Sequence, residues 1–303
     1  MSKRVSVALA LLTMVLWGSL FPMVKRGFAA YAVEGVADIL LFAGVRFVIC
    51  GGVICAFCAV FRRSHLRTAR GSLIPILLSG VFAILLHYGF TYLGLELTDS
   101  SKTALLKQAG TLLYVCFSFL FIKGEAPSGR KLASAAIGAC GILALNFDAG
   151  AFSFGIGELL ILLASLCTVA SNVISKQTMK AASPIAVTGI SQLFGGALLL
   201  VLGILMGGSL HVAFDSSLWI MGYICLASTV SYLIWFGVVK RADLSHLFII
   251  KLSEPLFACL FGALILGEDI FRLSYLVAFL LIAASILLST IQRKPKEKEK
   301  SLP

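Results

Sequence analysis

Residues 37–61, ADILLFAGVRFVICGGVICAFCAVF, decide the fold of this chain, because so long an apolar run suits the interior of a lipid bilayer. A bilayer core about 30 Å thick is crossed by roughly 20 residues of helix. Runs of similar character recur along the whole chain. The expected helices are 5–24, 37–61, 73–95, 103–122, 132–147, 156–175, 185–207, 218–239, 244–266 and 273–291. The fifth is the shortest, and the remaining loops are too short for a domain outside the membrane.

The composition of the whole chain supports this interpretation. Of its 303 residues, 59% are hydrophobic and only 13% are charged, and the mean hydropathy is +1.01. Soluble proteins average roughly 45–50% apolar and about 25% charged residues. The composition excludes a disordered chain, a coiled coil and a conventional nucleic-acid binder. We therefore expect an all-α integral membrane protein whose surroundings are the lipid bilayer.

The formal net charge of +11 mostly encodes orientation. Eighteen of the 25 Lys and Arg residues fall on the side of the expected helices that holds the N-terminus, and only four fall on the other side. Basic residues prefer short cytoplasmic loops, so both termini are expected in the cytoplasm. Residues 293–303 are expected to form a disordered basic tail. Residues 1–24 also fit a signal peptide, but the nine apolar runs that follow favour a retained helix.

The two halves of the chain show weak similarity to each other. The matching pairs, with one gap between the third and the fourth, are Asp99/Asp243, Ser101/Ser245, Lys107/Lys251, Cys116/Cys259, Gly124/Gly267 and Glu125/Glu268. Five expected helices separate equivalent positions, and five is odd, so the second half is inverted relative to the first. Inverted repeats are typical of secondary transporters. We expect two repeats, at 1–148 and 149–292.

Several short motifs distributed over the chain point to a family. They are Trp17-Gly18-Ser19 with Phe21 and Lys25, Arg46, Gly157-Glu158, Glu254-Pro255 and Gly267-Glu268. In this combination the chain resembles the drug/metabolite transporter superfamily and, within it, the EamA family. It departs from the family at Thr111 or Leu112, where a proline often stands in the fourth helix.

The resemblance carries expectations about fold and function. It implies ten transmembrane helices as two inverted five-helix repeats, around a central cavity lined mainly by helices 1, 3, 4, 6, 8 and 9. It also implies transport of small organic solutes, often amino acids and their relatives. The expected location is the cytoplasmic (inner) membrane of a bacterium.

Four ionisable residues lie well inside expected helices: Arg46, Lys107, Lys251 and Glu254. A charge at a helix centre costs about 2.5–3.5 kcal/mol on insertion scales, so each needs a partner or a wet cavity. Their excess of positive charge favours an anionic solute, and we expect Lys107 and Lys251 to flank its carboxylate or phosphate. Alternatively the lysines snorkel to the interface, while Glu254 pairs with Lys251 or carries a coupling proton. The family pattern makes helix 2 peripheral, so Arg46 is expected to anchor helix packing.

Other polar and aromatic residues inside the expected helices complete the predicted site. The candidates are Gln108, Asn172, Tyr88, Trp17, Tyr232 and Trp235 for solute binding and His87 for proton transfer. The amides could instead join helices, and the aromatic rings could simply pack. No second histidine or acid lies near His87 in the sequence, so it is a poor metal candidate.

Motifs of catalysis are missing from the sequence. There is no GxxxxGK[ST], HExxH, GxSxG or Cys/His cluster, and all eight cysteines lie inside expected helices. We therefore expect no enzyme, no cofactor, no metal and no ATP-driven pump; a channel or a structural protein is a rival class. The favoured function is secondary-active transport of a small anionic or zwitterionic metabolite, first an amino acid or derivative. A lipophilic-drug exporter and a phosphate-ester exchanger are the alternatives. Substrate identity, direction, proton coupling or exchange, and oligomeric state stay open.

Overall fold

The computed structural model describes residues 3–110, 112, 129–144, 147–148, 151–152, 154–211, 216–239, 250–251 and 253–290. Its first half contains α1 (Lys3–Ala30), α2 (Val36–Phe61), α3 (Arg63–Ala69), the 3-10 turn η1 (Arg70–Ser72), α4 (Leu73–Gly80), η2 (Val81–Leu86), α5 (His87–Glu96), α6 (Ser100–Leu106) and α8 (Gly129–Ala144). Its second half contains α9 (Ile156–Thr178), α10 (Pro184–Leu205), α11 (Ser216–Val239), α13 (Ser253–Leu266) and α14 (Leu273–Thr290). Between the halves, β1 (Phe147–Asp148) and β2 (Ala151–Phe152) form a small antiparallel hairpin.

The described helices match the apolar runs of the sequence. Six are long and apolar enough to cross a membrane, namely Arg4–Ala30, Val36–Phe61, Leu73–Glu96, Ile156–Ser175, Pro184–Leu205 and Ser217–Val238. Three shorter apolar helices are Leu132–Ala144, Ser253–Leu266 and Leu273–Ser285. These nine coincide with nine expected runs, although the fifth helix ends at Ala144, earlier than expected, because Phe147 pairs in the hairpin. The expected run 103–122 is described only as far as Leu112, so the count of ten helices stays a prediction.

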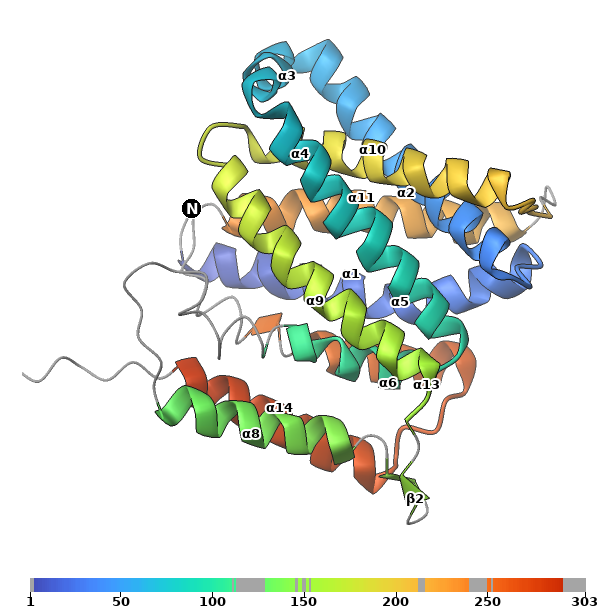
Figure 1. Ribbon diagram of the computed structural model, residues 1–303, viewed down its shortest axis with the longest axis vertical. Helices are drawn as coiled ribbons and strands as arrows, with labels where there is room; N and C mark the ends of the chain where they lie inside the picture. Colours follow the sequence, from blue (N-terminus) through green and yellow to red (C-terminus); the bar gives the residue numbers. More distant parts are fainter. Residues whose placement is uncertain are drawn as a thin grey trace, which may run out of the picture.

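The helices pack mainly in pairs and small groups (Figure 1). One group joins α10 to α2, another joins α9 to α4 and α5, and α14 lies along α8. Helix α1 packs against both α11 and α13, which gives the N-terminal helix a central position. First-half and second-half helices are therefore neighbours throughout the described part of the molecule.

Close packing between α2 and α10 depends on residues without a side chain. A Cβ added to Gly44 would lie 2.4 Å from the backbone nitrogen of Leu200, and one added to Gly51 would lie 2.3 Å from that of Leu193. Lipid tails are as apolar as the helix surfaces, so membrane helices associate through such close contacts rather than by hiding apolar area from water. The pair forms one wall of the bundle.

The outer surface of the bundle is strongly apolar. Ile74 is 80% exposed, Trp219 is 83% exposed and Leu264 is 72% exposed. In water so many exposed apolar side chains would be costly, whereas in a bilayer they face lipid. The interior, by contrast, contains a buried charge. Arg46 is only 1% exposed and is the largest of the fully buried side chains.

The third expected helix contains a distortion at its centre. Residues Leu73–Glu96 form one continuous apolar helix, in which η2 (Val81–Leu86) has the wider turns of a π-helix. Such π-helical turns occur often at functional sites, because they rotate the residues that follow relative to a regular helix. His87 and Tyr88 come directly after η2, and both face the interior of the bundle.

Candidate functional site

A single cavity brings together most of the residues predicted from the sequence. It lies between α1, α2, α4 to α6, α9, α10, α11 and α13 and encloses about 160 Å³. That volume is more than ten times the ~10–15 Å³ that one water molecule requires, so a small organic solute has room. The predicted residues that line it are Trp17, His87, Tyr88, Lys107, Gln108, Tyr232, Trp235, Lys251 and Glu254. The side chain of Asn172 lies outside the described residues.

Aromatic rings form one wall of the cavity. Trp17 packs edge-on against Tyr232 with ring centroids 5.6 Å apart, and its centroid is 5.1 Å from that of Trp235. The hydroxyl groups of Tyr88 and Tyr232 share a hydrogen bond that joins α5 to α11. Helix spacing explains why Tyr232 and Trp235 act together, because residues three apart lie on the same face. The wall offers flat apolar surface and cation-binding ring faces.

The ammonium group of Lys107 lies against aromatic rings. The Lys107 ammonium is 5.0 Å from the centroid of Phe21 and 5.7 Å from that of Tyr88, and Lys251 also lines the cavity. Ring faces attract a cation within about 6 Å, which offsets part of its cost of burial. Lys107 is therefore held inside the bundle, and the ring faces leave its N–H groups able to donate hydrogen bonds to another molecule.

Arg46 anchors helix packing as expected, but through a different partner. We expected it to anchor a peripheral helix through backbone carbonyls, but its Nε and Nη2 atoms donate to the hydroxyl of Ser228 on α11, at 3.0 and 2.6 Å. Its guanidinium also lies 4.7 to 5.7 Å from the ring centroids of Phe47, Tyr88 and Tyr92. It lines the cavity as well. The signal for this position was present in the sequence, because Arg46 is the only charge in the middle of its apolar run.

The charges of the cavity do not cancel. Arg46, Lys107 and Lys251 give three positive charges and Glu254 gives one negative charge, which leaves a formal +2. The ion pairs among the described residues are Lys102 with Glu158 and Arg272 with Asp269, both elsewhere. Lys251 and Glu254 thus do not form the direct ion pair that their i,i+3 spacing suggested. An enclosed site with excess positive charge favours an anionic group.

His87 is fixed by two groups of α9. Its Nδ1 lies 2.8 Å from the carbonyl of Ala164 and 2.8 Å from the hydroxyl of Thr168. A carbonyl oxygen only accepts, so the bond to Ala164 places the proton on Nδ1 and leaves Nε2 as the acceptor. No group of three His, Cys, Asp or Glu that could hold a metal ion exists within the described ranges.

Several buried polar atoms in the cavity wall lack a hydrogen-bond partner among the residues that the structure describes. They are Trp17 Nε1, Tyr92 Oη, Gln108 Oε1, and both Oε1 and Nε2 of Gln192. All belong to residues that line the cavity. An unsatisfied buried donor or acceptor costs about 1–3 kcal/mol, and most buried polar groups in proteins are paired. Their concentration around one cavity leaves several donors and acceptors available to whatever polar molecule fills it.

A second cluster, at the N-terminal end of α6, is fully paired. The Glu268 carboxylate accepts from the backbone N–H and the hydroxyl of Ser100, at 2.8 and 2.7 Å, and from those of Ser101, at 3.0 and 2.6 Å. Gly262 makes room, because a Cβ there would lie 2.6 Å from a Glu268 oxygen. Burial alone would raise the pKa of Glu268, but the bonds from Ser101 and Ser100 outweigh it and hold the pKa below its ordinary value.

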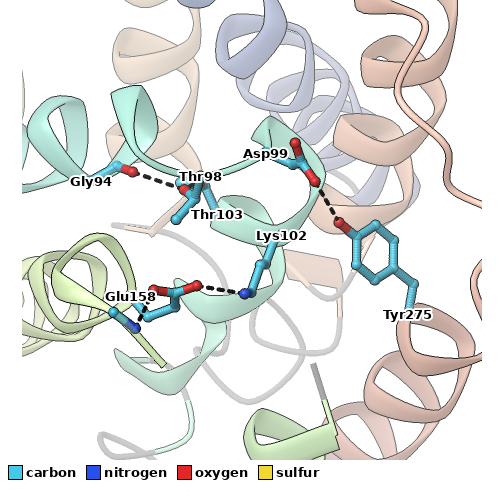
Figure 2. A network of polar contacts seen from close by, with 8 residues as sticks. Gly94, Thr98, Asp99, Lys102, Thr103, Glu158 and Tyr275 are labelled. Carbon is cyan, nitrogen blue, oxygen red and sulfur yellow. Dashed lines mark hydrogen bonds and ion pairs between the residues drawn. The ribbon is translucent and has the colours of Figure 1, made fainter. Parts of the chain in front are cut away.

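Two further contacts hold the same end of α6 (Figure 2). Lys102 pairs with Glu158 at the start of α9, whose other carboxylate oxygen accepts the backbone N–H of Gly155 at 2.9 Å. Asp99 accepts a hydrogen bond from Tyr275 of α14 at 3.3 Å. We call Ser100, Ser101 and Lys102 with their partners Glu158 and Glu268 the α6 latch. It joins first-half and second-half helices at one end of the bundle.

These features define a multi-pass membrane protein with a positively charged cavity of solute size. Sequence comparison then identifies the family. A profile of the EamA-like transporter family matches residues 4–147 and 155–290, so the chain belongs to that family. The family predicted from the short motifs is confirmed.

Curated relatives of similar length are named as transporters. An uncharacterized transporter, YoaV of Bacillus subtilis, is 27% identical over 84% of this chain and 89% of its own. A probable amino-acid metabolite efflux pump of Escherichia coli is 26% identical over 93% of each chain. An S-adenosylmethionine/S-adenosylhomocysteine transporter of Chlamydia muridarum is 22% identical over 88% of this chain and 86% of its own.

A solved structure has the same fold. One protein crystal structure superposes with a TM-score of 0.68, covering 95% of this chain and 97% of its own, at 18% sequence identity. The likeness extends over nearly the whole chain, so the helix arrangement described above is one that an experimentally determined protein also adopts.

Proposed function

We propose that this protein is a secondary-active transporter that moves a small anionic or zwitterionic organic metabolite across the cytoplasmic membrane of a bacterium. An amino acid or an amino-acid derivative is the favoured substrate. The observation that carries the proposal is the enclosed cavity in which three cations face one carboxylate. Membership of the EamA-like transporter family and the names of the curated relatives support transport as the activity.

Each charged residue has a role in this proposal. The ammonium groups of Lys107 and Lys251 bind the carboxylate of the substrate, and Arg46 adds to the positive field. Glu254 accepts the ammonium group of a zwitterion, which a simple anion would leave unused. The aromatic wall around Trp17 and Tyr232 contacts the apolar part of the solute. These roles fit the relatives named for amino-acid metabolites and for S-adenosylmethionine, which itself carries an amino-acid head.

Transport requires that the cavity opens to each side in turn. In our proposal the two repeats, 1–148 and 149–292, rock against each other around the cavity. The α6 latch closes the end that we assign to the outside, an assignment supported by the scarcity of basic residues in the loops on that side. Opening that end requires Glu268 and Glu158 to release α6.

A phosphate-ester exchanger is the second candidate. The uncompensated lysines favour it, since phosphate is a dianion near neutral pH and would match a formal +2. Glu254 opposes it, because a carboxylate at the same site repels a phosphate. A lipophilic or cationic drug fits the aromatic wall but not the positive charge.

A ligand screen followed by a transport assay tests the proposal. Purified protein is heated with amino acids, carboxylates, nucleosides, sugar phosphates or a lipophilic cation, because a ligand that binds the folded state raises the apparent melting temperature. The hits are then measured by counterflow in proteoliposomes, in which a carrier exchanges labelled for unlabelled solute. We expect amino-acid derivatives to give both signals. Stabilisation by the lipophilic cation alone, or binding without counterflow, would contradict the proposal.

A further inference from the structure

The cavity has a polar end, displaced along α9 from Ser165, whose hydroxyl donates to the Lys107 carbonyl at 3.4 Å. We define it by the hydroxyl groups of Ser79 on α4 and Ser171 and Ser175 on α9, and by Thr188, Ser191 and Gln192 on α10; all six line the cavity. Ser175 lies seven residues beyond Thr168, which contacts His87. At 1.5 Å per residue, the polar end is roughly 10 Å along the bundle from the level of His87.

The three helices of the polar end are packed tightly together. The hydroxyl groups of Ser79 and Ser175 share a hydrogen bond of 2.7 Å between α4 and α9. A Cβ on Gly80 would lie 2.7 Å from the carbonyl oxygen of Ser191, which sets α10 directly against α4. Gln192 follows Ser191 and is therefore held on a rigid part of the wall.

The hydroxyl groups of the polar end are already used within the bundle. Ser171, Thr188 and Ser191 donate to backbone carbonyls of their own helices, at 2.9, 2.8 and 3.2 Å. Gln192 is different, because it is only 1% exposed and neither amide atom has a partner in the described part of the chain. Gln192 thus keeps an unused NH₂ group and an unused carbonyl oxygen side by side on a single carboxamide.

The geometry of a carboxamide determines what it can bind. Its oxygen accepts while its NH₂ group donates, and both lie in one plane. The complement is a planar group with a neighbouring donor and acceptor. A second carboxamide has this arrangement, and so does the edge of an aminopurine, which glutamine pairs through the purine N6 and N7 atoms. A charged group would leave half of this pairing unused.

We propose that the substrate has two ends: an amino-acid head bound near Lys107, and an uncharged head with adjacent donor and acceptor bound by Gln192. This inference rests on the proposed function and narrows its substrate class. It selects elongated amino-acid derivatives that end in a carboxamide or an aminopurine. Gln192 then determines which uncharged head is accepted, and it does not supply most of the binding affinity.

Matched ligand pairs test the inference without a mutation. The carboxamide pair is L-glutamine and L-glutamic acid 5-methyl ester, in which the ester lacks the donor. The aminopurine pair is S-adenosyl-L-homocysteine and S-inosyl-L-homocysteine, in which a carbonyl replaces the amine. Each pair keeps the amino-acid head. Binding to the purified full-length protein is measured by calorimetry, and we expect the first member of one pair to bind about tenfold tighter or more.

Variants assign that preference to Gln192. In Gln192→Leu we expect the preference to fall to within about twofold while the weaker ligand keeps its affinity. Gln192→Met serves if the leucine variant is not monodisperse. The matched control is Gln177→Leu, because Gln177 is exposed on α9 and lies outside the cavity. A merely structural Gln192 would change the melting temperature but not the preference.

The outcomes separate this inference from the proposed function. A wild-type protein that binds amino acids but shows no preference within either pair overturns the inference alone. A preference that persists in Gln192→Leu also overturns it. If no amino acid or carboxylate binds the wild-type protein, the proposed function fails, and the inference fails with it.

Discussion

Polar groups at the two ends of α6 differ in whether their hydrogen bonds are satisfied within the protein. At its beginning, Ser100 and Ser101 give all four of their donors to the two oxygens of Glu268. Just past its end, the Lys107 ammonium lies over two ring faces, and Gln108 keeps an oxygen with no partner in the described structure. Paired groups stabilise the fold, whereas unpaired ones reduce stability and are free to bind a solute. Substitutions at the two ends should therefore have opposite consequences.

The largest expected effect is at Lys107. Replacement of this lysine by methionine keeps the length of the side chain but removes the charge that we assign to the substrate carboxylate. We expect the affinity for an anionic or zwitterionic ligand to fall about 100-fold, since a buried charged pair is worth several kcal/mol when one partner is removed. Without ligand, the apparent melting temperature should stay the same or rise, because a buried cation is no longer present.

The control for this prediction is Lys180→Met, since Lys180 is exposed and lies outside the cavity. Calorimetry gives the affinity, and thermal unfolding in detergent gives the stability. Unchanged affinity in a correctly folded Lys107→Met protein would mean that the lysine does not contact the solute. In that case the unpaired end of α6 would have no role in solute binding.

The second largest expected effect is at Glu268, where we expect a change in stability rather than in ligand affinity. Glu268→Gln turns one acceptor oxygen into an NH₂ group that faces the donors of a serine. We expect the free energy of unfolding to fall by about 1–3 kcal/mol, while ligand affinity changes little. Thermal unfolding with Glu96→Gln as the control tests this, because Glu96 is exposed at the end of α5. A stability equal to that of the wild type would show that the four hydrogen bonds contribute nothing.

The smallest expected effect is the pH dependence of the α6 latch. The pKa of Glu268 lies below its ordinary value of 4.5, so folding favours the ionised carboxylate. Its stabilisation is present above that ordinary value and is lost as the pH falls through the lower pKa of the folded protein. The difference in melting temperature between the wild type and Glu268→Gln should therefore narrow as the pH falls below the ordinary carboxyl value of 4.5. A constant difference would contradict this assignment.

The sequence predicts the helices better than it predicts their contacts. Long apolar runs need only the thickness of a bilayer to be recognised, which is why nine of them coincide with described helices. The predicted cavity residues share a sequence signal too, because polar groups inside apolar runs need a polar environment. The packing role of Arg46 is confirmed by its bonds to α11, but the partner is a serine hydroxyl, which the sequence did not identify.

Contacts between distant positions could not be predicted in this way. Glu268 and Ser101 each belong to a recognisable motif, but they are 167 positions apart, and hydropathy does not report which helices meet. The polar end was not predicted either, because its residues give no distinctive sequence signal. Serine and threonine are ordinary residues in membrane helices, where they bond to their own backbone, so Ser79 and Ser175 have no distinctive pattern. The repeat positions Asp243, Ser245, Cys116, Gly124 and Glu125 lie outside the described residues.

The approach of α13 to α6 leaves a native thiol at a useful position. Cys259 is free, and it lies one turn before Gly262, where an added Cβ would be 2.7 Å from the Ser101 hydroxyl oxygen. The molecule therefore already contains half of a disulfide across the closed end of the bundle, and Ser101→Cys supplies the other half. The fraction of the protein that an oxidant crosslinks would report the fraction of time that α6 and α13 spend in contact. The population of the closed state could then be measured in intact cells.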